Sequence, residues 1–310
     1  MKKVFITRRL PAIAEETLEK KFYVYGSREN EPYPRKLLPE IVGKYDAVLS
    51  TVTEKFDREI LKQKGKLTVI SNYAVGLDNI DVEFAKSLGI AIYNTIDVVT
   101  NSTADLTFSI LLSLIRKILL AQVFIRNDNW NTWDPELFLG EELSGKVFGI
   151  LGFGKIGQAV ARRAFGFDLD IIFANRSDID AKYYNGLKAT CVSFDELLAK
   201  SDFISIHLPL TDLTRGIINR QIISKMKRKP IIINMSRGEI VVTNDLLDAL
   251  KRGKIRGACL DVTSPEPIRA DHPLCQLENC IIVPHIGTAT LECRHNMALL
   301  AAENIINHFN

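Results

Sequence analysis

Short apolar runs alternate with helical patterns from the start of the chain. Before residue 100, five runs have the length and the β-branched or aromatic content of strands. They cover residues 4–7, 23–25, 47–50, 67–70 and 90–93. Strands that alternate with helices indicate a parallel sheet with helices packed on it.

The same alternation continues in the second half of the chain. The strands predicted there cover residues 147–151, 170–174, 203–207, 231–235, 257–260 and 280–283. A chain of 310 residues exceeds what one core usually covers, so two domains are expected. The predicted fold class is therefore α/β, with two doubly wound, Rossmann-like parallel-sheet domains and the active-site cleft between them.

The apolar run 147–151 leads directly into a glycine-rich turn and a helical pattern. The turn is Gly152-Phe153-Gly154-Lys155-Ile156-Gly157. Gly152 permits the tight turn, Gly154 lets a pyrophosphate approach the backbone, and Gly157 lets the helix pack closely on the strand. The N–H groups at the start of the following helix suit phosphates. These six residues predict a dinucleotide site.

The strand after this turn ends in Asn175-Arg176-Ser177. In an NAD site, an acidic residue at this point binds the ribose 2′-hydroxyl. Asn175 is neutral and would not repel a 2′-phosphate, whereas Arg176 and Ser177 can both donate hydrogen bonds to one. We therefore predict NADP(H) as the cofactor, with NAD(H) binding less tightly. The alternative is that Arg176 is a solvated charge and that Asp178 or Asp180 reaches the ribose.

Charge and hydropathy narrow the range of partners. The 40 basic and 37 acidic residues are interspersed and leave a net charge of +3, so no basic stripe marks a nucleic-acid site. Residues 106–120 predict one helix that is buried on more than one side, and its polar residues and its length argue against a bilayer span. Neither nucleic acid nor a membrane is an expected partner.

The cysteines indicate neither a disulfide framework nor a metal site. They are odd in number and lack the CxxC or Cys/His spacing of metal ligands. We expect buried thiols in a reducing compartment, with a cytoplasmic location and no metal. The five are Cys191, Cys259, Cys275, Cys280 and Cys293.

Three segments that follow predicted strands carry reactive side chains. They are Asn234-Met235-Ser236-Arg237-Gly238, the run DVTSPEP at 261–267 and the run PHIGTAT at 284–290. In an open α/β sheet, ligands bind beyond the carboxyl ends of the strands, so these segments are expected to converge on the cofactor crevice. Together they supply a base, a carboxylate that orients it, and a cation that binds an anion.

On these motifs the chain resembles the D-2-hydroxyacid dehydrogenase family from end to end, and within it the glyoxylate/hydroxypyruvate reductases. The resemblance implies an NADP-dependent enzyme that reduces glyoxylate to glycolate and hydroxypyruvate to D-glycerate. Hydride would come from the nicotinamide C4. It also implies that Arg237 binds the substrate carboxylate and carbonyl, that Glu266 is the glutamate partner, and that His285 is the acid/base.

Each implied catalytic role has a physical reason. Hydride transfer to a keto group places negative charge on oxygen, so an imidazolium such as that of His285 must deliver a proton. A carboxylate bonded to the other ring nitrogen, here Glu266, fixes the tautomer and favours the protonated ring. The planar guanidinium of Arg237 can hold a carboxylate and polarise a carbonyl.

The resemblance also implies further ligand contacts. In the first domain, the N–H groups of Val75 and Gly76 would bind the substrate carboxylate, as consecutive amides in a turn can. Such a small pocket suits glyoxylate and hydroxypyruvate. Asp261 is expected near the nicotinamide carboxamide. The remaining cofactor positions implied by the family are Leu208, Pro209 and Met235.

The domain change is expected near Ser102-Thr103-Ala104-Asp105, which has capping-box spacing ahead of an apolar run. The final helical pattern, 291–308, follows the last strand, and the pattern leaves open whether it returns to the first domain. With that return, residues 1–98 and 287–310 form a discontinuous substrate-binding domain. Residues 99–286 form the NADP-binding Rossmann domain.

Trp130 and Trp133 resemble a pair in these reductases, in which the second tryptophan reaches the active site of the partner in a homodimer. Packing in the core of one chain is an equally weighted alternative. Two other functions remain open. One is another NAD(P)-dependent D-2-hydroxyacid dehydrogenase, such as a D-lactate or phosphoglycerate dehydrogenase. The other is a dinucleotide-sensing scaffold like the transcriptional corepressors that share this fold.

Overall fold

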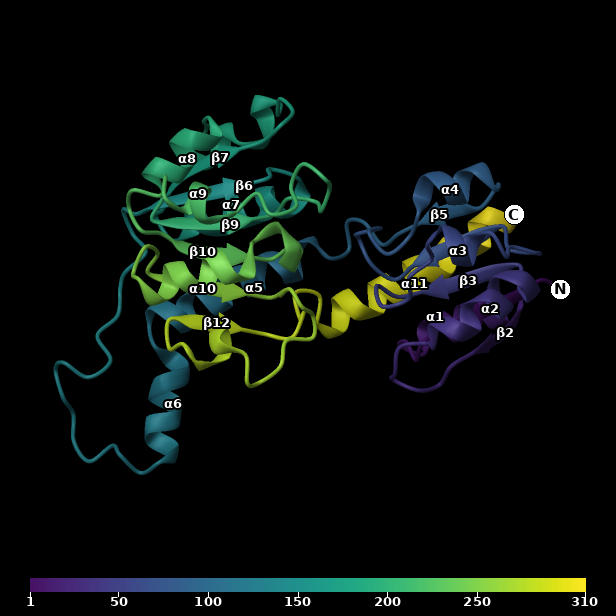
Figure 1. The fold of residues 1–310 in the computed structure, drawn as a ribbon, viewed down its shortest axis with the longest axis horizontal. Helices are drawn as coiled ribbons and strands as arrows, with labels where there is room; N and C mark the ends of the chain where they lie inside the picture. The colour runs from purple at the N-terminus through teal and green to yellow at the C-terminus, as the bar shows by residue number, and fades with distance from the viewer. The chain divides into compact units, whose positions relative to one another are not determined.

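The structure is a computed structural model that describes residues 1–310, and it divides into two compact units. Unit 1 comprises Met1–Val99 and Thr288–Asn310, and unit 2 comprises Thr100–Gly287. Each unit contains one parallel sheet with helices packed on it (Figure 1). The prediction of two parallel-sheet α/β domains is confirmed.

Unit 1 has a five-stranded sheet in the order β2-β1-β3-β4-β5. The predicted strands are all present, and the fourth lies two residues later than predicted. β3 and β4 are buried along their whole length, as expected for central strands of a parallel sheet. The strands are β1 (Lys3–Ile6), β2 (Tyr23–Gly26), β3 (Ala47–Ser50), β4 (Val69–Asn72) and β5 (Ala91–Tyr93).

The C-terminal helix packs within unit 1, where it contacts α1 and β4 (Figure 1, yellow). Its inner face carries the fully buried Ala298, Ala301 and Ala302, and small side chains at this spacing let another element approach closely. The sequence pattern had left this placement open. The helices of unit 1 are α1 (Ile13–Glu19), η1 (Arg35–Leu37), α2 (Leu38–Lys44), α3 (Arg58–Leu61), α4 (Val82–Ser87) and α11 (Leu291–Phe309).

Unit 2 has a seven-stranded sheet in the order β12-β11-β10-β9-β6-β7-β8. The strand order reverses between β6 and β9, which makes the carboxyl ends of these two strands the topological switch point. β8 was not predicted, because it is a three-residue edge strand in which only Ala189 is buried. The strands are β6 (Val147–Leu151), β7 (Asp170–Ala174), β8 (Ala189–Cys191), β9 (Phe203–Ile206), β10 (Ile231–Asn234), β11 (Gly257–Leu260) and β12 (Cys280–Ile282).

Helices cover the sheet of unit 2, and α5 packs against α7. On the sheet, Phe108 of α5 stacks on Phe148 of β6 with ring centroids 5.4 Å apart. The helices are α5 (Thr100–Ile115), α6 (Ile118–Arg126), α7 (Lys155–Gly166), α8 (Phe194–Lys200), α9 (Arg220–Ile223) and α10 (Thr243–Lys251). The 3-10 turns are η2 (Ala181–Tyr183), η3 (Asn185–Leu187), η4 (Gly238–Ile240) and η5 (Pro273–Gln276).

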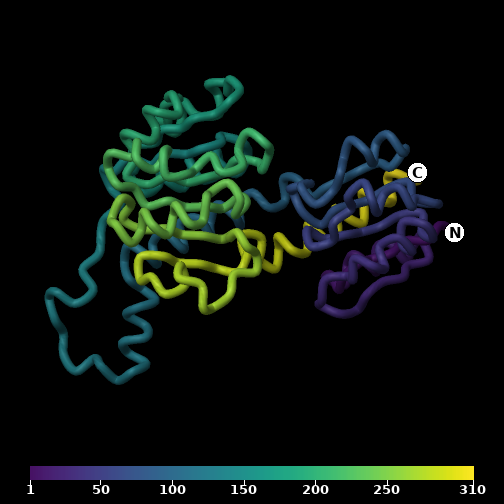
Figure 2. The backbone as a smooth tube through the Cα atoms, viewed as in Figure 1, coloured from purple at the N-terminus to yellow at the C-terminus, as the bar shows by residue number.

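The single buried helix predicted over 106–120 is wrong. Helix α5 begins at Thr100, before the predicted cap at Ser102, and it ends at Ile115. The helical conformation is interrupted at Lys117, which has a left-handed φ of 52°, before α6 begins at Ile118. α5 buries eight of its residues, whereas α6 buries none. α6 and the segment after it project from the sheet of unit 2 (Figure 2). No single helix combines the length and apolarity of a membrane span, although the bent pair α5 and α6 together has both.

All five cysteines are free thiols. Cys259 and Cys293 are buried, but Cys191 and Cys275 are exposed. The expectation of uniformly buried thiols is therefore wrong, because β8 lies at a sheet edge and η5 lies at the surface.

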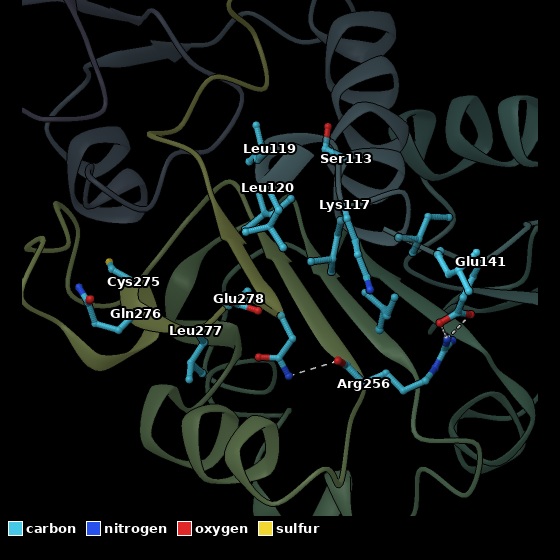
Figure 3. Close-up of a pocket in the computed structure, with 18 residues that line it drawn as sticks. Ser113, Lys117, Leu119, Leu120, Glu141, Arg256, Cys275, Gln276, Leu277 and Glu278 are labelled. Carbon is cyan, nitrogen blue, oxygen red and sulfur yellow. Dashed lines mark hydrogen bonds and ion pairs between the residues drawn. The ribbon is translucent and has the colours of Figure 1, made fainter. Parts of the chain in front are cut away.

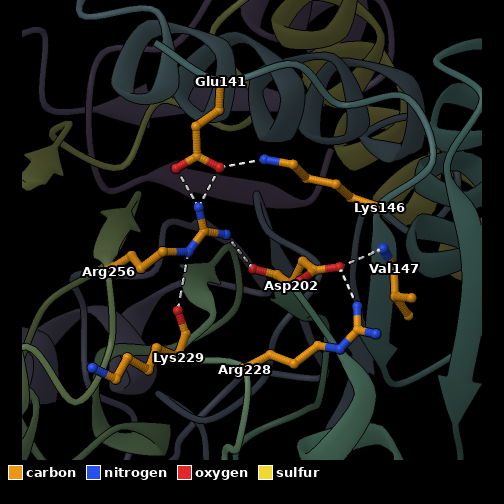
Figure 4. A network of polar contacts seen from close by, with 7 residues as sticks. All are labelled: Glu141, Lys146, Val147, Asp202, Arg228, Lys229 and Arg256. Atoms are coloured by element: carbon orange, nitrogen blue, oxygen red, sulfur yellow. Dashed lines mark hydrogen bonds and ion pairs between the residues drawn. The ribbon is translucent and has the colours of Figure 1, made fainter. Parts of the chain in front are cut away.

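A network of ion pairs lies at the edge of the unit 2 sheet where its strands begin (Figure 4). Glu141 accepts hydrogen bonds from Lys146 and Arg256, and Arg256 also donates to the carbonyl oxygen of Asp202 at 3.0 Å. Burial would raise the pKa of Glu141, but the bonds from Lys146 and Arg256 hold it below the usual value. The network ties together the starts of β6, β9 and β11. The opposite, carboxyl edge is left for ligands.

Candidate active site

The glycine turn has the geometry that its sequence requires. Gly152 has a φ of +90°, and a Cβ there would lie 2.7 Å from the carbonyl oxygen of His207. A Cβ on Gly157 would lie 2.2 Å from the carbonyl oxygen of Gly152. Both positions therefore exclude a side chain. At Gly154, by contrast, a Cβ would meet nothing within 4 Å, so the backbone there faces open space.

This open space lies at a helix N-terminus. Gly154 is the N-cap of α7, and no acidic side chain occupies the first turn. The N–H groups and the helix dipole at such an end attract phosphate. The turn also follows β6 at the topological switch point, where dinucleotides bind in such sheets. The residues of the turn therefore fit a dinucleotide.

Asn175, at the end of β7, is bonded within the protein. Its Oδ1 accepts from the N–H of Phe153 at 3.1 Å, and its Nδ2 donates to the carbonyl oxygen of Ser177 at 2.8 Å. It thus ties the glycine turn to the segment after β7. Arg176 and Ser177 are exposed, and the guanidinium of Arg176 makes no ion pair. Asp178, one of the two alternative ribose ligands, is also exposed and makes no ion pair.

Asp180, one of the alternative ribose ligands, is already paired. It lies 2.8 Å from the Nζ atom of Lys182 and accepts a 3.0 Å hydrogen bond from the Lys182 N–H. The bond from the Lys182 side chain lowers the pKa of Asp180. A ribose hydroxyl would have to compete with these contacts.

His285 and Glu266 form a direct pair between the loops that follow β12 and β11. Their Nδ1 and Oε1 atoms lie 2.7 Å apart. The second oxygen of Glu266 accepts from the N–H of Thr263 at 3.2 Å. Burial would raise the pKa of Glu266, but the hydrogen bond and charge of His285 hold it below the usual value. The His285 side chain remains 35% exposed, so the ring can be reached by a ligand.

Asp261 holds the backbone of the His285 loop. Its two carboxylate oxygens accept from the N–H groups of Ile286 at 2.7 Å and Gly287 at 2.9 Å, and its carbonyl accepts from the His285 N–H. Burial raises the pKa of Asp261, and these backbone bonds oppose the rise. His285 has a left-handed φ of 52°, which this anchoring sustains. Both oxygens of Asp261, expected near a carboxamide, thus bind the loop.

Arg237 follows β10 and lies on a loop whose backbone is held by hydrogen bonds from the side chain of Asn234. Asn234, which is 1% exposed, accepts from the Ser236 N–H at 3.1 Å and donates to the Arg237 carbonyl at 2.9 Å. A Cβ on Gly238 would lie 1.9 Å from the Thr263 carbonyl oxygen, so only glycine lets this loop meet the loop of Glu266. The charge of Arg237 contributes to the low pKa of Glu266. The loops that carry Arg237 and Glu266 are therefore in direct contact.

The other cofactor residues implied by the family lie at the ends of β9 and β10. Leu208 approaches to 3.2 Å from where a Gly152 Cβ would lie, Pro209 is exposed, and Met235 is 7% exposed. His207, which no sequence spacing distinguished, lies between β9 and Leu208. Its Nε2 lies 2.8 Å from the Ser205 hydroxyl, and burial lowers its pKa to about 3.

The second ring nitrogen of His207, Nδ1, is shielded from solvent and has no hydrogen-bond partner. Buried polar atoms are normally paired, so an unpaired one beside the Gly152 turn is unusual.

In unit 1, Val75 and Gly76 lie between β4 and α4, and their N–H groups have no acceptor within the protein. Val75 is 37% exposed. Trp130 and Trp133, in unit 2, are 60% and 78% exposed, so the alternative that they pack in the core of one chain is wrong.

The fold and the site together define an α/β dehydrogenase. Residues 108–287 match the family described as D-isomer specific 2-hydroxyacid dehydrogenase, NAD binding domain. The chain is 44% identical to the glyoxylate reductase of Thermococcus litoralis, over 98% of this chain and 92% of the relative. The chain belongs to the D-isomer specific 2-hydroxyacid dehydrogenase family.

Two solved structures extend this comparison. The TT0316 protein from Thermus thermophilus matches with a TM-score of 0.91 at 38% identity, over 98% of this chain and 96% of that chain. An NADPH-dependent glyoxylate/hydroxypyruvate reductase from Sinorhizobium meliloti, in complex with NADP and malonate, matches with a TM-score of 0.88 at 26% identity. That match covers 100% of this chain and 94% of the other. The similarity therefore extends over both units.

Proposed function

We propose that this protein reduces glyoxylate to glycolate with NADPH, and hydroxypyruvate to D-glycerate as a second reaction. The observation that carries the proposal is the pairing of His285 with Glu266 beside Arg237, at the carboxyl edge of a sheet whose glycine turn fits a dinucleotide. The relatives named glyoxylate reductase, which match over nearly the whole chain, support the choice of substrate.

His285, Glu266 and Arg237 each have a separate role in the proposed reduction. A bound nicotinamide supplies hydride. His285 holds a proton on Nε2 and releases it to the substrate oxygen as negative charge develops there. Glu266, bonded to Nδ1, keeps the ring in the required tautomer and balances the charge of the imidazolium. Arg237 holds the substrate carboxylate and polarises its carbonyl, as the planar guanidinium fork allows.

For the substrate carboxylate we assign a second contact, the N–H groups of Val75 and Gly76. Both are free to donate, and consecutive amides that converge bind anions. Glyoxylate and hydroxypyruvate are small acids, each with one carboxylate for these two donors.

The preference for NADPH rests on Arg176 and Ser177. The guanidinium of Arg176 is exposed and makes no ion pair, whereas Asp180 is held by Lys182. A 2′-phosphate would find the Arg176 guanidinium here, and Asp178 is the carboxylate of this segment that makes no ion pair. The solved relative in complex with NADP supports this assignment.

The test is a spectrophotometric assay of NADPH and NADH consumption with glyoxylate, hydroxypyruvate, pyruvate and 3-phosphohydroxypyruvate. We expect glyoxylate and hydroxypyruvate to give the highest kcat/KM, and NADPH to exceed NADH. A preference for pyruvate or 3-phosphohydroxypyruvate would assign a different member of the family. Turnover of none of the four would favour a dinucleotide-sensing scaffold.

We further propose a homodimer built on the projecting segment of unit 2. α6 buries no residue, and Leu119, Val123 and Ile125 are each more than half exposed. Beside α6 lies a cavity of about 640 Å³, with Leu119 and Leu120 on one side and Leu277 on the other (Figure 3). The exposed apolar side chains of α6 indicate an interface. A second copy of the chain is the occupant that we assign.

The oligomeric state tests this proposal. Val123→Asp should shift the protein from dimer to monomer in light scattering, whereas the control Leu213→Asp, at a site 75% exposed and outside this segment, should remain dimeric. If Trp133 reaches the site of the partner, Trp133→Ala should change substrate preference more than stability. A wild-type protein that is monomeric at all concentrations contradicts the dimer.

A further inference from the structure

Two neighbouring carbonyl groups of the Val75 turn are held by the segment that follows β5. The carbonyl oxygen of Ala74 accepts from the Thr95 N–H at 2.8 Å. The carbonyl oxygen of Val75 accepts from the Nδ2 of Asn94, also at 2.8 Å. Because Asn94 and Thr95 are consecutive, both carbonyls point toward the same short stretch of chain.

The geometry of the peptide bond then fixes where the amides point. The peptide bonds of the Val75 turn are trans. In a planar trans peptide the carbonyl and the N–H point in opposite directions. The N–H groups of Val75 and Gly76 therefore both point away from Asn94 and Thr95. Neither donates to a protein acceptor, so both are available to one anion.

A second asparagine supports the turn from the core. Asn72 is fully buried, and its Nδ2 donates to the Gly76 carbonyl at 3.0 Å, while its Oδ1 accepts from the Ser50 hydroxyl at 3.0 Å. It also bonds Asn79. Because Asn72 is part of a buried network, replacing it would disturb the fold as well as the turn.

Asn94 differs from Asn72 in a way that makes it informative. It is only half-buried, and its side chain makes one hydrogen bond, to the Val75 carbonyl. Its main role in the structure is thus to set the orientation of the peptide group that carries the Gly76 N–H.

We propose that Asn94 is a positioning residue for substrate binding: it orients the Val75–Gly76 peptide so that its N–H faces the carboxylate of the 2-keto acid. This inference rests on the proposed function, in which that turn binds the carboxylate. Asn94 touches neither the reacting carbon nor the oxygen that is reduced. Its loss therefore weakens binding of the acid and leaves the chemical step nearly unchanged.

The variant that tests this is Asn94→Ala, with Asn94→Leu as a second variant that restores the side-chain volume without the donor. Both are neutral, so neither repels the substrate by charge. The matched control is Asn279→Ala, since Asn279 also donates its Nδ2 to a backbone carbonyl, that of Arg256 at 3.2 Å, in unit 2. The readouts are KM and kcat for glyoxylate, and the Kd values for oxalate and for NADPH.

For both Asn94 variants we expect KM for glyoxylate and Kd for oxalate to rise on the order of tenfold, the effect of weakening one hydrogen bond to a charged group. The value of kcat should change less than about threefold, and Kd for NADPH and the Tm should match those of Asn279→Ala. A general loss of structure would move all of these quantities together. The split between them is what marks a positioning role.

Two results would overturn the inference, and they differ from each other. If the wild type reduces glyoxylate and binds oxalate but the Asn94 variants bind both as tightly as Asn279→Ala does, Asn94 has no positioning role and the proposed function stands. If the wild type neither reduces glyoxylate nor binds oxalate, the proposed function is wrong and this inference falls with it.

Discussion

The Nδ1 atom of His285 lies 2.7 Å from the Oε1 atom of Glu266, although the two residues are on separate loops. The two loops follow the neighbouring strands β11 and β12, and Asp261 binds the backbone N–H groups of the His285 loop. The orientation of the imidazole is therefore set by the sheet itself. The consequences of this arrangement can be measured.

Glu266→Gln should keep a hydrogen-bonding side chain beside His285 but remove its negative charge. An imidazolium without that charge is less stable, so kcat for glyoxylate reduction should fall by about tenfold or more. Glu239→Gln, at an exposed glutamate 3.7 Å from Arg215, is the control and should behave as wild type. A variant with unchanged kcat across the pH range contradicts the assigned role.

Alanine substitutions at two glycines of the turn should separate an effect on stability from an effect on cofactor binding. Gly157→Ala places a Cβ 2.2 Å from a carbonyl oxygen and should lower Tm markedly. Gly154→Ala meets nothing within 4 Å, and its backbone φ of −72° is ordinary for alanine, so Tm should stay near wild type. Its Kd for NADPH should nevertheless rise by about tenfold or more, because the methyl group occupies the approach to the helix N-terminus. Unimpaired NADPH binding by Gly154→Ala would place the pyrophosphate elsewhere.

Arg176→Ala tests cofactor preference. Loss of a charge-assisted bond to a 2′-phosphate should raise KM for NADPH by about tenfold or more and leave KM for NADH within about twofold. Arg162→Ala, at an exposed cation on α7 that makes no ion pair, provides the comparison. If Arg176→Ala changes KM for NADPH and for NADH equally, Arg176 does not bind the 2′-phosphate.

Glu54 should make the stability of unit 1 depend on pH. It is 1% exposed and accepts hydrogen bonds from the hydroxyls of Thr7 and Thr53, both at 2.7 Å, and from the N–H groups of Thr51 and Tyr33. Burial alone would raise its pKa, but these bonds hold it below the usual value of 4.5.

Because the folded pKa of Glu54 is depressed, its contribution to stability is present above pH 4.5 and is lost as pH falls through the folded pKa. Glu54→Gln should therefore cost about 2 kcal/mol at neutral pH, where an amide faces the same donors. The Tm difference between wild type and variant should shrink as the pH is lowered below 4.5. A difference that stays constant over that range would exclude the titration of Glu54 as its cause.

The sequence pattern predicts most strands here because each central strand is a short run of mostly β-branched or other apolar residues, with at most two polar ones. The pattern does not predict a strand that has few buried residues, or a helix that is interrupted by a residue in the left-handed conformation. β8 has a single buried residue, and the break at Lys117 depends on a left-handed residue within an otherwise continuous apolar stretch. Neither feature changes hydrophobic periodicity.

The candidate site is predictable to a similar extent. The motifs around Arg237, Glu266 and His285 mark residues at strand ends, and the parallel sheet brings such ends together. The hydrogen bonds that hold these loops cannot be predicted from the spacing of residues in the sequence, because they join side chains to backbone groups that are distant along the chain. Asp261 bonds two N–H groups that are 25 and 26 residues away, and Asn94 bonds a carbonyl 19 residues away.

The role of His285 is the central claim, and the variant His285→Asn tests it most directly. Asparagine keeps a hydrogen-bonding side chain but cannot deliver a proton near neutral pH. We expect kcat for glyoxylate reduction to fall by about a hundredfold or more, with Kd for NADPH, measured by fluorescence titration, unchanged. Turnover close to that of wild type, in a variant that binds NADPH normally, would contradict the assignment of His285 as the proton donor.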